Sequence, residues 1–165
     1  MITLQRVQET DRQRLYHLLQ KYLYELTAIY DIELDEKGDY EYPYFEDYFT
    51  DSTREAWLIM QEQAVVGFVL LNQHSNIGAK PDHNIAEFCV LPKYRKAHVA
   101  TQTFELLCRM HPGKWEIKFS KKNAPAARLW TRVTRCYEPS VYHLEDGETV
   151  LLFDTGSHVM MGEMI

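Results

Sequence analysis

The spacing of apolar residues divides the chain into short strands and amphipathic helices. From Ile2 to Val7, apolar and polar side chains alternate, which is typical of a half-buried strand. From Leu15 onward, leucines and tyrosines recur every three or four residues, which predicts a helix with one buried face. Thr10 and Gln13 have the spacing of a capping box at the start of this helix, and the pattern ends near Tyr30.

Further apolar runs and the turn residues between them predict the remaining elements. Pro43 lies in an aromatic segment and favours a short second helix. Pro92 ends a strand because proline has no backbone donor. Helices are expected from about His98 to the His-Pro-Gly stop at residues 111–113, and after Asn123 as N-cap. The predicted strands in this part of the chain are Ala56 to Met60, Val65 to Leu71, Ile85 to Leu91, Trp115 to Phe119, Val141 to Leu144 and Thr149 to Phe153.

Length and composition restrict the class of protein. A chain of 165 residues with 45% hydrophobic residues suits one domain with a core of ordinary size. We expect that domain in residues 1–155 and a C-terminal tail in residues 156–165. No basic start followed by a long apolar run is present, and the three cysteines are odd in number and widely spaced. These features predict a cytoplasmic protein with reduced thiols, without a metal site or a membrane partner.

The charges are segregated along the chain. Residues 31–51 contain nine acidic side chains and one lysine, whereas residues 93–135 contain eleven basic and two acidic side chains. The first segment is expected to attract cations and the second to attract anions; alternatively, both are solvated faces. The net charge of -6 argues against a general nucleic-acid binder, and no nucleic-acid partner is expected.

A strand that ends in proline and leads through a basic loop into a helix carries the strongest functional signal. A helix N-terminus presents backbone amides that have no intrahelical partner, together with the positive end of the helix dipole. Such a terminus binds a pyrophosphate. The segment is Phe88-Cys89-Val90-Leu91-Pro92-Lys93-Tyr94-Arg95-Lys96-Ala97-His98-Val99-Ala100.

This segment resembles the acyl-CoA signature of the Gcn5-related N-acetyltransferase (GNAT) family, a strand, a proline and a loop of Arg or Gln, two residues, Gly, one residue, and Gly or Ala. Arg95 and Ala100 match, and His98 stands where glycine is usual. The resemblance implies an α/β fold with a mixed, mostly antiparallel sheet of six to seven strands flanked by about four helices. It also implies acetyl-CoA as the co-substrate, bound by Phe88, Cys89, Val90, Arg95, Lys96, Ala97, His98, Val99 and Ala100.

A second segment, Asn123-Ala124-Pro125-Ala126-Ala127-Arg128-Leu129-Trp130, is similar to the later helix signature of the family, NxxAxxLY. The resemblance implies that Asn123 contacts the pantetheine arm of the cofactor. Asn123 serves equally well as a simple N-cap, and the two roles are compatible. Trp130 replaces the usual tyrosine, which resembles a less characterised subgroup of predicted acetyltransferases.

The substitution at Trp130 changes the expected acid chemistry. In many family members the tyrosine at this position protonates the departing thiolate, and an indole does not. Tyr137 or Tyr142 substitutes for it, or solvent does. Glu87 is the candidate general base, because the resemblance places a base directly before the cofactor-pairing strand residues; alternatively, it forms an ion pair at the strand edge. Strand alternation puts Glu87 on the opposite sheet face from Phe88.

We expect a direct ternary-complex reaction, because no cysteine lies beside an evident base. The backbone amide of Val90 is expected to polarise the thioester oxygen. The acidic, tyrosine-rich segment before residue 51 favours a cationic acceptor, a primary amine of a small molecule or a peptide. Its aromatic residues line this acceptor site or pack in the core, and they are Tyr40, Tyr42, Tyr44, Phe45 and Tyr48.

Two rival functions use the same residues. His98 at the glycine position and Trp130 at the acid position favour a non-catalytic acyl-CoA sensor or interaction module on the same fold. A nucleic-acid-binding domain would use the basic half, but cofactor phosphates explain that half better. The expected assembly is a monomer or a homodimer.

Overall fold

Seven strands form one sheet in the computed structural model, which describes residues 1–156. The strand order is β1-β2-β3-β4-β5-β7-β6, and all neighbours are antiparallel except β4 and β5, which are parallel. The strands are β1 (Ile2–Arg6), β2 (Glu55–Gln61), β3 (Ala64–Asn72), β4 (His83–Val90), β5 (Lys114–Ser120), β6 (Ser140–His143) and β7 (Glu148–Asp154).

Four α-helices and three short 3-10 helices complete residues 1–156. The mixed, mostly antiparallel sheet and the number of α-helices confirm the predicted fold class. The α-helices are α1 (Arg12–Leu26), α2 (Asp47–Thr50), α3 (Val99–Met110) and α4 (Ala124–Thr134), and the 3-10 helices are η1 (Glu9–Asp11), η2 (Pro92–Tyr94) and η3 (Arg135–Tyr137).

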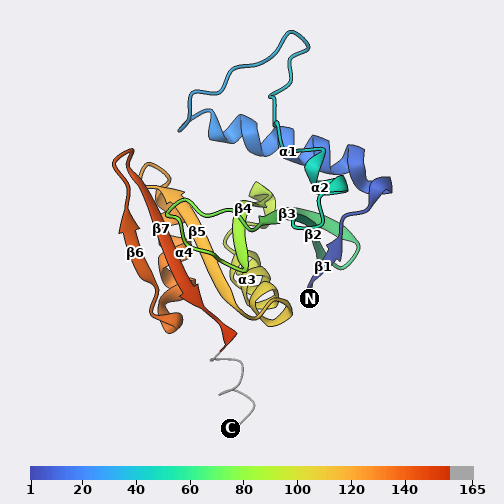
Figure 1. Cartoon of the computed structure of the whole chain (residues 1–165). Coiled ribbons are helices and arrows are strands. Elements are labelled where there is room, and N and C mark those ends of the chain that lie inside the picture. The colour runs from blue at the N-terminus through green and yellow to red at the C-terminus, as the bar shows by residue number, and fades with distance from the viewer. Residues whose placement is uncertain (157–165) are drawn as a thin grey trace.

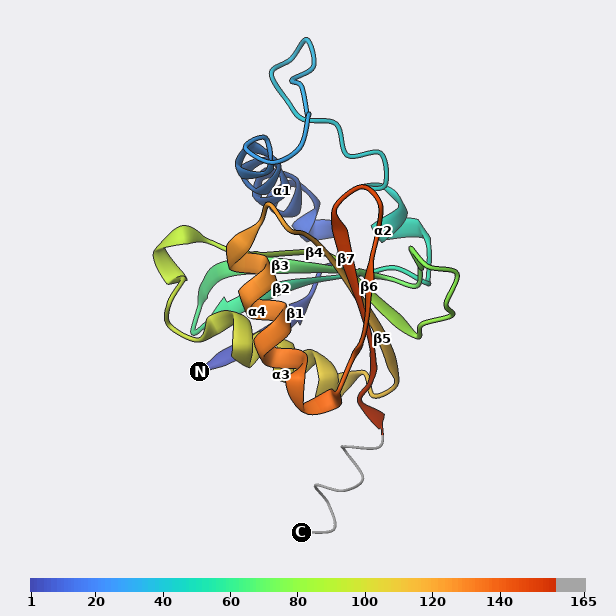
Figure 2. The same cartoon turned by 90° about the vertical axis from the view of Figure 1, so that its left-hand side faces the viewer.

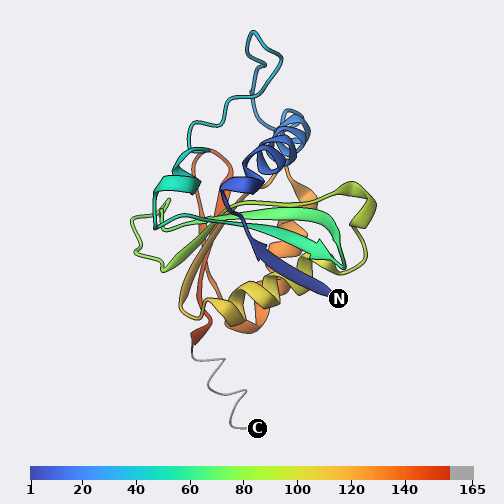
Figure 3. The same cartoon turned by 90° about the vertical axis from the view of Figure 1, so that its right-hand side faces the viewer.

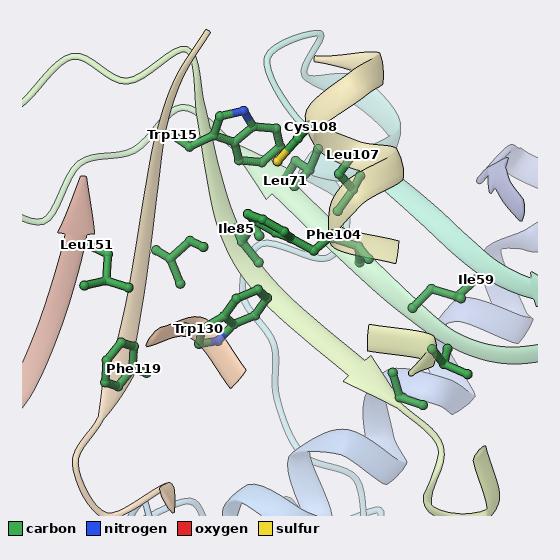
Figure 4. Close-up of a cluster of buried hydrophobic side chains, with 14 of the residues drawn as sticks. Ile59, Leu71, Ile85, Phe104, Leu107, Cys108, Trp115, Phe119, Trp130 and Leu151 are labelled. Atoms are coloured by element: carbon green, nitrogen blue, oxygen red, sulfur yellow. The ribbon is translucent and has the colours of Figure 1, made fainter. Parts of the chain in front are cut away.

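The sheet is covered on both faces, by α1 and α2 on one and by α3 and α4 on the other (Figure 1). Because strand side chains alternate between the two faces, each strand contributes to two cores. The core under α1 includes Leu15, Leu19 and Phe68, which are at most 1% exposed. The core under α3 and α4 is centred on Phe104, Trp115 and Trp130 (Figure 4).

The predicted start and end of the first helix are wrong. Residues 9–11 form η1 instead, and the Asp11 carboxylate accepts a hydrogen bond from the Gln8 amide at 3.0 Å. The short carboxylate therefore caps the turn that the Thr10 and Gln13 pair was expected to cap, and α1 begins at Arg12. This helix ends at Leu26, before the predicted end near Tyr30.

The connection between α1 and α2 projects away from the rest of the molecule (Figure 3). It contains most of the acidic segment. The predicted second helix begins at Asp47, after Pro43, and has a single turn. None of the helices in residues 1–156 combines the length and apolar character needed to cross a membrane. Residues 157–165 of the predicted tail lie outside the described part of the chain.

The two halves of the sheet diverge between β4 and β5. These parallel strands pair only over three positions, His83 with Trp115, Asn84 with Glu116 and Ile85 with Ile117. Beyond these positions the strands separate. In Figure 2, β4 is roughly horizontal, whereas β5 and β7 are steeply inclined. Strand β4 therefore has an edge that no strand in residues 1–156 pairs beyond Ile85.

A β-bulge in β4 sets which side chains face which helix layer. Leu71 pairs with Ile85 and Leu70 pairs with Glu87, so Ala86 is the extra residue. Ile85 and Phe88 pack in the core under α3 and α4. Glu87 hydrogen-bonds to Tyr42 on the opposite face, at 3.4 Å. The face predicted for Glu87 relative to Phe88 is the one observed.

Gly67 allows β3 to lie unusually close to β4. A Cβ atom at this position would be 2.0 Å from the Cys89 carbonyl oxygen. Only glycine permits that approach, because any side chain would displace the backbone of β4. Strand β3 therefore holds one edge of β4 firmly, and the other edge of β4 is the unpaired one.

Candidate functional site

A cleft of about 800 Å³ occupies the space where β4 and β5 separate. Its walls are the end of β4, the loop into α3, the first half of α4 and the C-terminal half of α1. Nine of the ten residues predicted to bind the cofactor line this cleft, and Ala97 is the exception.

The loop into α3 presents backbone donors at the cleft. Within the described residues, the amides of residues 96–101 have no hydrogen-bond partner, and the first helical bond runs from the Gln102 amide to the His98 carbonyl at 3.0 Å. His98 adopts left-handed backbone geometry with φ of 60°. The histidine thus takes the conformation that a glycine adopts without strain, and the loop keeps its course.

The unpaired edge of β4 presents a second set of backbone groups. The Leu91 amide donates to the Val66 carbonyl of β3 at 2.8 Å, and the Cys89 carbonyl lies against Gly67. Because successive residues of a strand direct their backbone groups to opposite edges, Phe88 and Val90 direct theirs toward the cleft. Cys89, which was expected to act with them, directs its backbone to β3.

Helix α4 forms the opposite wall of the cleft. The Asn123 side chain accepts a hydrogen bond from the Ala126 amide at 3.2 Å, so its predicted N-cap role is confirmed, and it also lines the cleft. Trp130 is 5% exposed and packs edge-on against Phe88 with ring centroids 5.0 Å apart. Three exposed basic side chains line the rim, Lys96, Arg128 and Arg132.

Glu87 lies on the other side of β4 from α4, below α1. Burial raises the pKa of its carboxyl to about 7, and hydrogen bonds from Tyr22 and Tyr42 partly offset this rise. A carboxyl with this pKa accepts protons readily near neutral pH. Glu87 thus has the protonation behaviour of a general base, and it is one strand residue from the cleft-facing backbone of Phe88.

A polar pocket of about 410 Å³ opens beside Glu87. It lies between the ends of β3 and β5 and the segment before β2, and Tyr42, Arg54 and Lys118 line it. None of the nine acidic residues of segment 31–51 lines this pocket, although Tyr42 and Tyr44 do. Of the aromatic residues considered for an acceptor site, Tyr48 is 7% exposed and packs in the core under α1.

Comparison with known proteins places this architecture in a family. The family model described as "Acetyltransferase (GNAT) family" matches residues 12–134. The chain belongs to this family. Its characteristic chemistry, acetyl transfer, is consistent with a cleft at the separation of β4 and β5. Among curated proteins, none is similar enough in sequence to match.

Solved GNAT structures share the fold at low sequence identity. An aminoglycoside acetyltransferase, AAC(6')-Ib, in complex with coenzyme A has a TM-score of 0.71 and 13% identity, and the match covers 99% of each chain. NAA60 of Arabidopsis thaliana in complex with acetyl-CoA has a TM-score of 0.61 and 16% identity, covering 93% of this chain and 98% of the other. A GNAT acetyltransferase of Staphylococcus aureus has a TM-score of 0.64 and 13% identity, covering 94% and 99%.

Two residues of the GNAT loop are placed differently from the prediction. The Arg95 amide is bonded to the Pro92 carbonyl at 3.2 Å. Its guanidinium forms a bidentate pair with Glu25 of α1 at 2.8 and 2.9 Å and also donates to the Val90 carbonyl at 2.7 Å. Arg95 therefore fixes the loop to α1 and β4 instead of offering free donors. Ala97 is exposed and lies outside the cleft lining.

The structure does not bring Tyr137, the predicted acid of this GNAT protein, to the cleft. Its ring stacks on Phe153 with centroids 5.6 Å apart, and its hydroxyl hydrogen-bonds with the Cys108 thiol. Burial raises the pKa of Tyr137 to about 12. These contacts place Tyr137 against the core under α3, so we do not assign it to the reaction. Tyr142, the other tyrosine considered, is exposed on β6 and is not part of the cleft lining either.

Tyr22 is a functional candidate that the sequence analysis missed. It lines the cleft between β4 and β5, lies close enough to Glu87 for the two groups to shift each other's pKa, and packs edge-on against Phe68 at 5.6 Å. Burial and the neighbouring Glu87 raise its pKa well above the ordinary range, so it stays protonated as a donor. Tyr22 belongs to the apolar stripe of α1, so its sequence position indicates a core residue. Only the folded structure shows that it lies near Glu87.

Glu116 of β5 is a second residue near the polar pocket that was not predicted from the sequence. It is 0% exposed, and its carboxylate accepts hydrogen bonds from Ser75 at 2.6 Å and from the Asn76 amide at 2.7 Å. These bonds hold the loop between β3 and β4 over the end of β5. Because Asn76 also lines the polar pocket, Glu116 shapes the pocket without lying in it.

Proposed function

We propose that this GNAT protein transfers the acetyl group of acetyl-CoA to a primary amine of a small molecule or a peptide, by direct attack within a ternary complex. One observation carries the proposal: residues 96 and 98–101, whose amides are unbonded, line a cleft of about 800 Å³ that also includes the unpaired edge of β4. That combination suits a diphosphate joined to an extended chain with amide groups.

The chain's own groups supply complementary contacts along the cleft. The amides at the N-terminus of α3 and its dipole favour the phosphates, and Lys96, Arg128 and Arg132 add positive charge at the rim. The backbone of Phe88 and Val90 faces the path of the pantetheine arm. Asn123 retains a side-chain amide donor there while its oxygen caps α4.

The chemistry is assigned to Glu87. When bound, acetyl-CoA supplies an activated acetyl group and a thiolate leaving group. An ammonium ion has no lone pair for attack, so Glu87 takes the proton of the acceptor amine, directly or through water. The Val90 amide, on the cleft edge of β4, stabilises negative charge on the carbonyl oxygen. Cys89 and Cys108 are buried, which favours direct attack over a covalent intermediate on the protein.

The nature of the acceptor is supported less directly. AAC(6')-Ib was solved in complex with coenzyme A and kanamycin, which supports a small-molecule amine as acceptor for the fold. The acidic segment around residues 31–51 was the reason to expect a cationic acceptor, yet its carboxylates lie outside the polar pocket. We therefore propose an amine acceptor on the α1 side of β4, next to Glu87.

A non-catalytic acyl-CoA sensor is the second candidate. It is favoured by one observation, that Trp130 replaces the tyrosine on α4 and Tyr137 lies in the core. In the transferase, water protonates the thiolate. In the sensor, no thiolate is released.

Thermal shift and thiol release separate these functions. Acetyl-CoA, CoA and desulfo-CoA are expected to raise the melting temperature of the full chain, because a ligand that binds only the native state stabilises it. Acetyl-CoA with a panel of amines is expected to release free thiol in an enzyme-dependent manner. Stabilisation without thiol release for any amine would support the sensor, and no stabilisation by any of the three compounds would reject both functions.

A further inference from the structure

The polar pocket beside Glu87 is lined by groups of two kinds, hydrogen-bond acceptors and cations. It measures about 410 Å³, within the range of small-molecule sites, and it lies on the opposite side of β4 from the cofactor cleft. The acceptors are on Asn72, Asn84 and Glu87, and the cations are Arg54 and Lys118. Each set restricts the chemistry of the acceptor.

Asn84 offers a buried oxygen that no group in residues 1–156 satisfies. Its Nδ2 donates to the Asn72 Oδ1 at 2.7 Å, and this same oxygen accepts from the His74 backbone amide at 3.1 Å. Since a backbone amide is always a donor, the orientation of both side-chain amides is fixed. The Asn84 Oδ1 is then a hydrogen-bond acceptor without a partner, on a side chain that is 5% exposed.

Buried polar atoms in native proteins are almost always hydrogen-bonded, so an orphan oxygen in a pocket indicates a ligand donor or a water. Glu87, three residues further along β4, is also an acceptor when it is ionised. The bulge at Ala86 brings these two side chains to the same face of β4. Two acceptors side by side suit the N–H groups of an amine.

Two cationic side chains also line the pocket, Arg54 and Lys118. The Arg54 side chain is 18% exposed and lies over the Tyr44 and Tyr48 rings, 5.0 and 5.4 Å from their centroids. Its one carboxylate partner in residues 1–156, Asp51, is 3.6 Å away and 42% exposed. Lys118, which is exposed on β5, forms no ion pair with any described residue. Two positively charged side chains therefore line the pocket against the single carboxylate of Glu87, and in the described part of the chain only Arg54 has an acidic partner, the exposed Asp51.

We infer that the acceptor is a small amine that also carries an anionic group, a carboxylate or a phosphate, held by Arg54 and Lys118 while its amine lies at Glu87 and Asn84. The inference rests on the proposed function and specifies its substrate class. A second positive charge on the acceptor would instead approach two cations, which would repel it. The cationic acceptor expected from the acidic segment is thus disfavoured by the pocket.

A matched panel of acceptors tests the inference. Three series of primary amines with two to six carbons differ only in the group at the other end, which is a carboxylate or phosphate, a methyl group, or a second amine. With the full chain and acetyl-CoA, thiol release is expected to be at least tenfold more efficient, as kcat/KM, for the best anionic amine than for the matched diamine. The carboxylate and phosphate arms distinguish the two anions.

Two substitutions give the panel a control. Lys118→Glu is expected to lower kcat/KM for the anionic amines at least tenfold and to improve the diamines relative to them. Lys114→Glu makes the same charge change at another exposed position of β5, outside the pocket, and is expected to leave the order of the series unchanged. Lys118→Gln serves as a milder variant if the reversal impairs folding.

Failure of this inference and failure of the proposed function give different results. Thiol release that favours the diamines or the neutral amines would overturn the inference and leave the transferase intact. If no amine releases thiol, calorimetry with the three series still decides: binding of the anionic amines that Lys118→Glu removes supports the site, and tighter binding of diamines, or no binding by any series, overturns it.

Discussion

The two sides of β4 are built in different ways. On the α4 side, the proposed binding groups are mainly backbone amides of residues 96 and 98–101 and backbone groups of Phe88 and Val90. On the α1 side, the binding groups are side chains brought together from distant parts of the chain, among them Tyr42, Arg54 and Lys118. The first side depends on local backbone geometry and the second on the tertiary fold.

Because of this difference, the two sides should tolerate different amino-acid substitutions. A site made of main-chain amides accepts a change of side chain if the backbone keeps its course, as His98 does with φ of 60°. A site made of side chains changes its ligand when one residue changes. Substitutions on the α4 side should therefore alter cofactor affinity, and those on the α1 side should alter turnover and acceptor choice.

The largest expected effect comes from Glu87→Gln. Loss of the base is expected to lower kcat about 10² to 10⁴-fold, because positioned proton transfer contributes that much. Affinity for acetyl-CoA, measured by calorimetry, should stay within about threefold, since the group lies on the other side of β4. A large loss of cofactor affinity would contradict the division between the two sides.

The same residue predicts the pH dependence. The pKa of Glu87 is raised to about 7, so the base form is lost as the pH falls through this value. The kcat/KM of the wild type, corrected for ionisation of the amine, should rise about tenfold per pH unit below pH 7 and level off above it. The residual activity of Glu87→Gln should lack this rise, and an unchanged profile would exclude Glu87 as the titrating group.

The next effect is expected on the cofactor side, from Ala100→Glu. Ala100 lines the cleft at the N-terminus of α3, so a carboxylate there repels the cofactor phosphates. We expect the Kd for acetyl-CoA to rise about 100-fold, equivalent to about 2.7 kcal/mol. Ala97→Glu places the same charge on the same loop but outside the cleft, and should change the Kd much less. Equal effects of both variants would point to general repulsion instead of a local phosphate site.

A smaller effect is expected from Tyr22→Phe, which tests the residue that contacts both sides. Removing its hydroxyl takes a hydrogen bond from Glu87 and is expected to lower kcat about tenfold. The bond lowers the pKa of Glu87, so its loss should also shift the pH profile to higher pH. Tyr24→Phe, on the same helix with a 68% exposed side chain, is the matched control and should have no effect on either quantity.

The smallest effect is expected from His98→Gly. Glycine adopts φ of 60° without the steric cost that a side chain carries. The free energy of unfolding should rise by about 0.5 to 1 kcal/mol in chemical denaturation, with little change in the Kd for acetyl-CoA. A loss of stability would show that the imidazole makes a favourable contact that outweighs the strain.

Much of the fold and most of the cofactor side follow from the sequence because their signals are local. Pro92 marks the end of β4, and the apolar stripe of the following segment marks α3. Asn123 caps α4 as predicted. Arg95 lines the cleft as predicted, but its pairing with Glu25, 70 residues away, was not predicted. No local pattern reveals such a pair.

The acceptor side follows from the sequence only in part. Glu87 was found from its position before the strand signature, but the bulge at Ala86 that places it beside Asn84 has no sequence signal of its own. The acidic segment suggested a cationic acceptor, but none of its carboxylates lines the pocket, because most of the segment projects away from the sheet. Arg54 and Lys118 are isolated in sequence and meet only in the folded chain.

Helix α1 connects the two sides within a single helical turn. Tyr22 lies near Glu87. Glu25, three residues later on the same face of α1, forms an ion pair with Arg95 in the loop before α3. Variants of this turn will therefore produce mixed kinetic phenotypes, in which the apparent order of substrate addition and both Michaelis constants change together. Attempts to engineer acceptor preference should leave this helical turn intact and begin at β5.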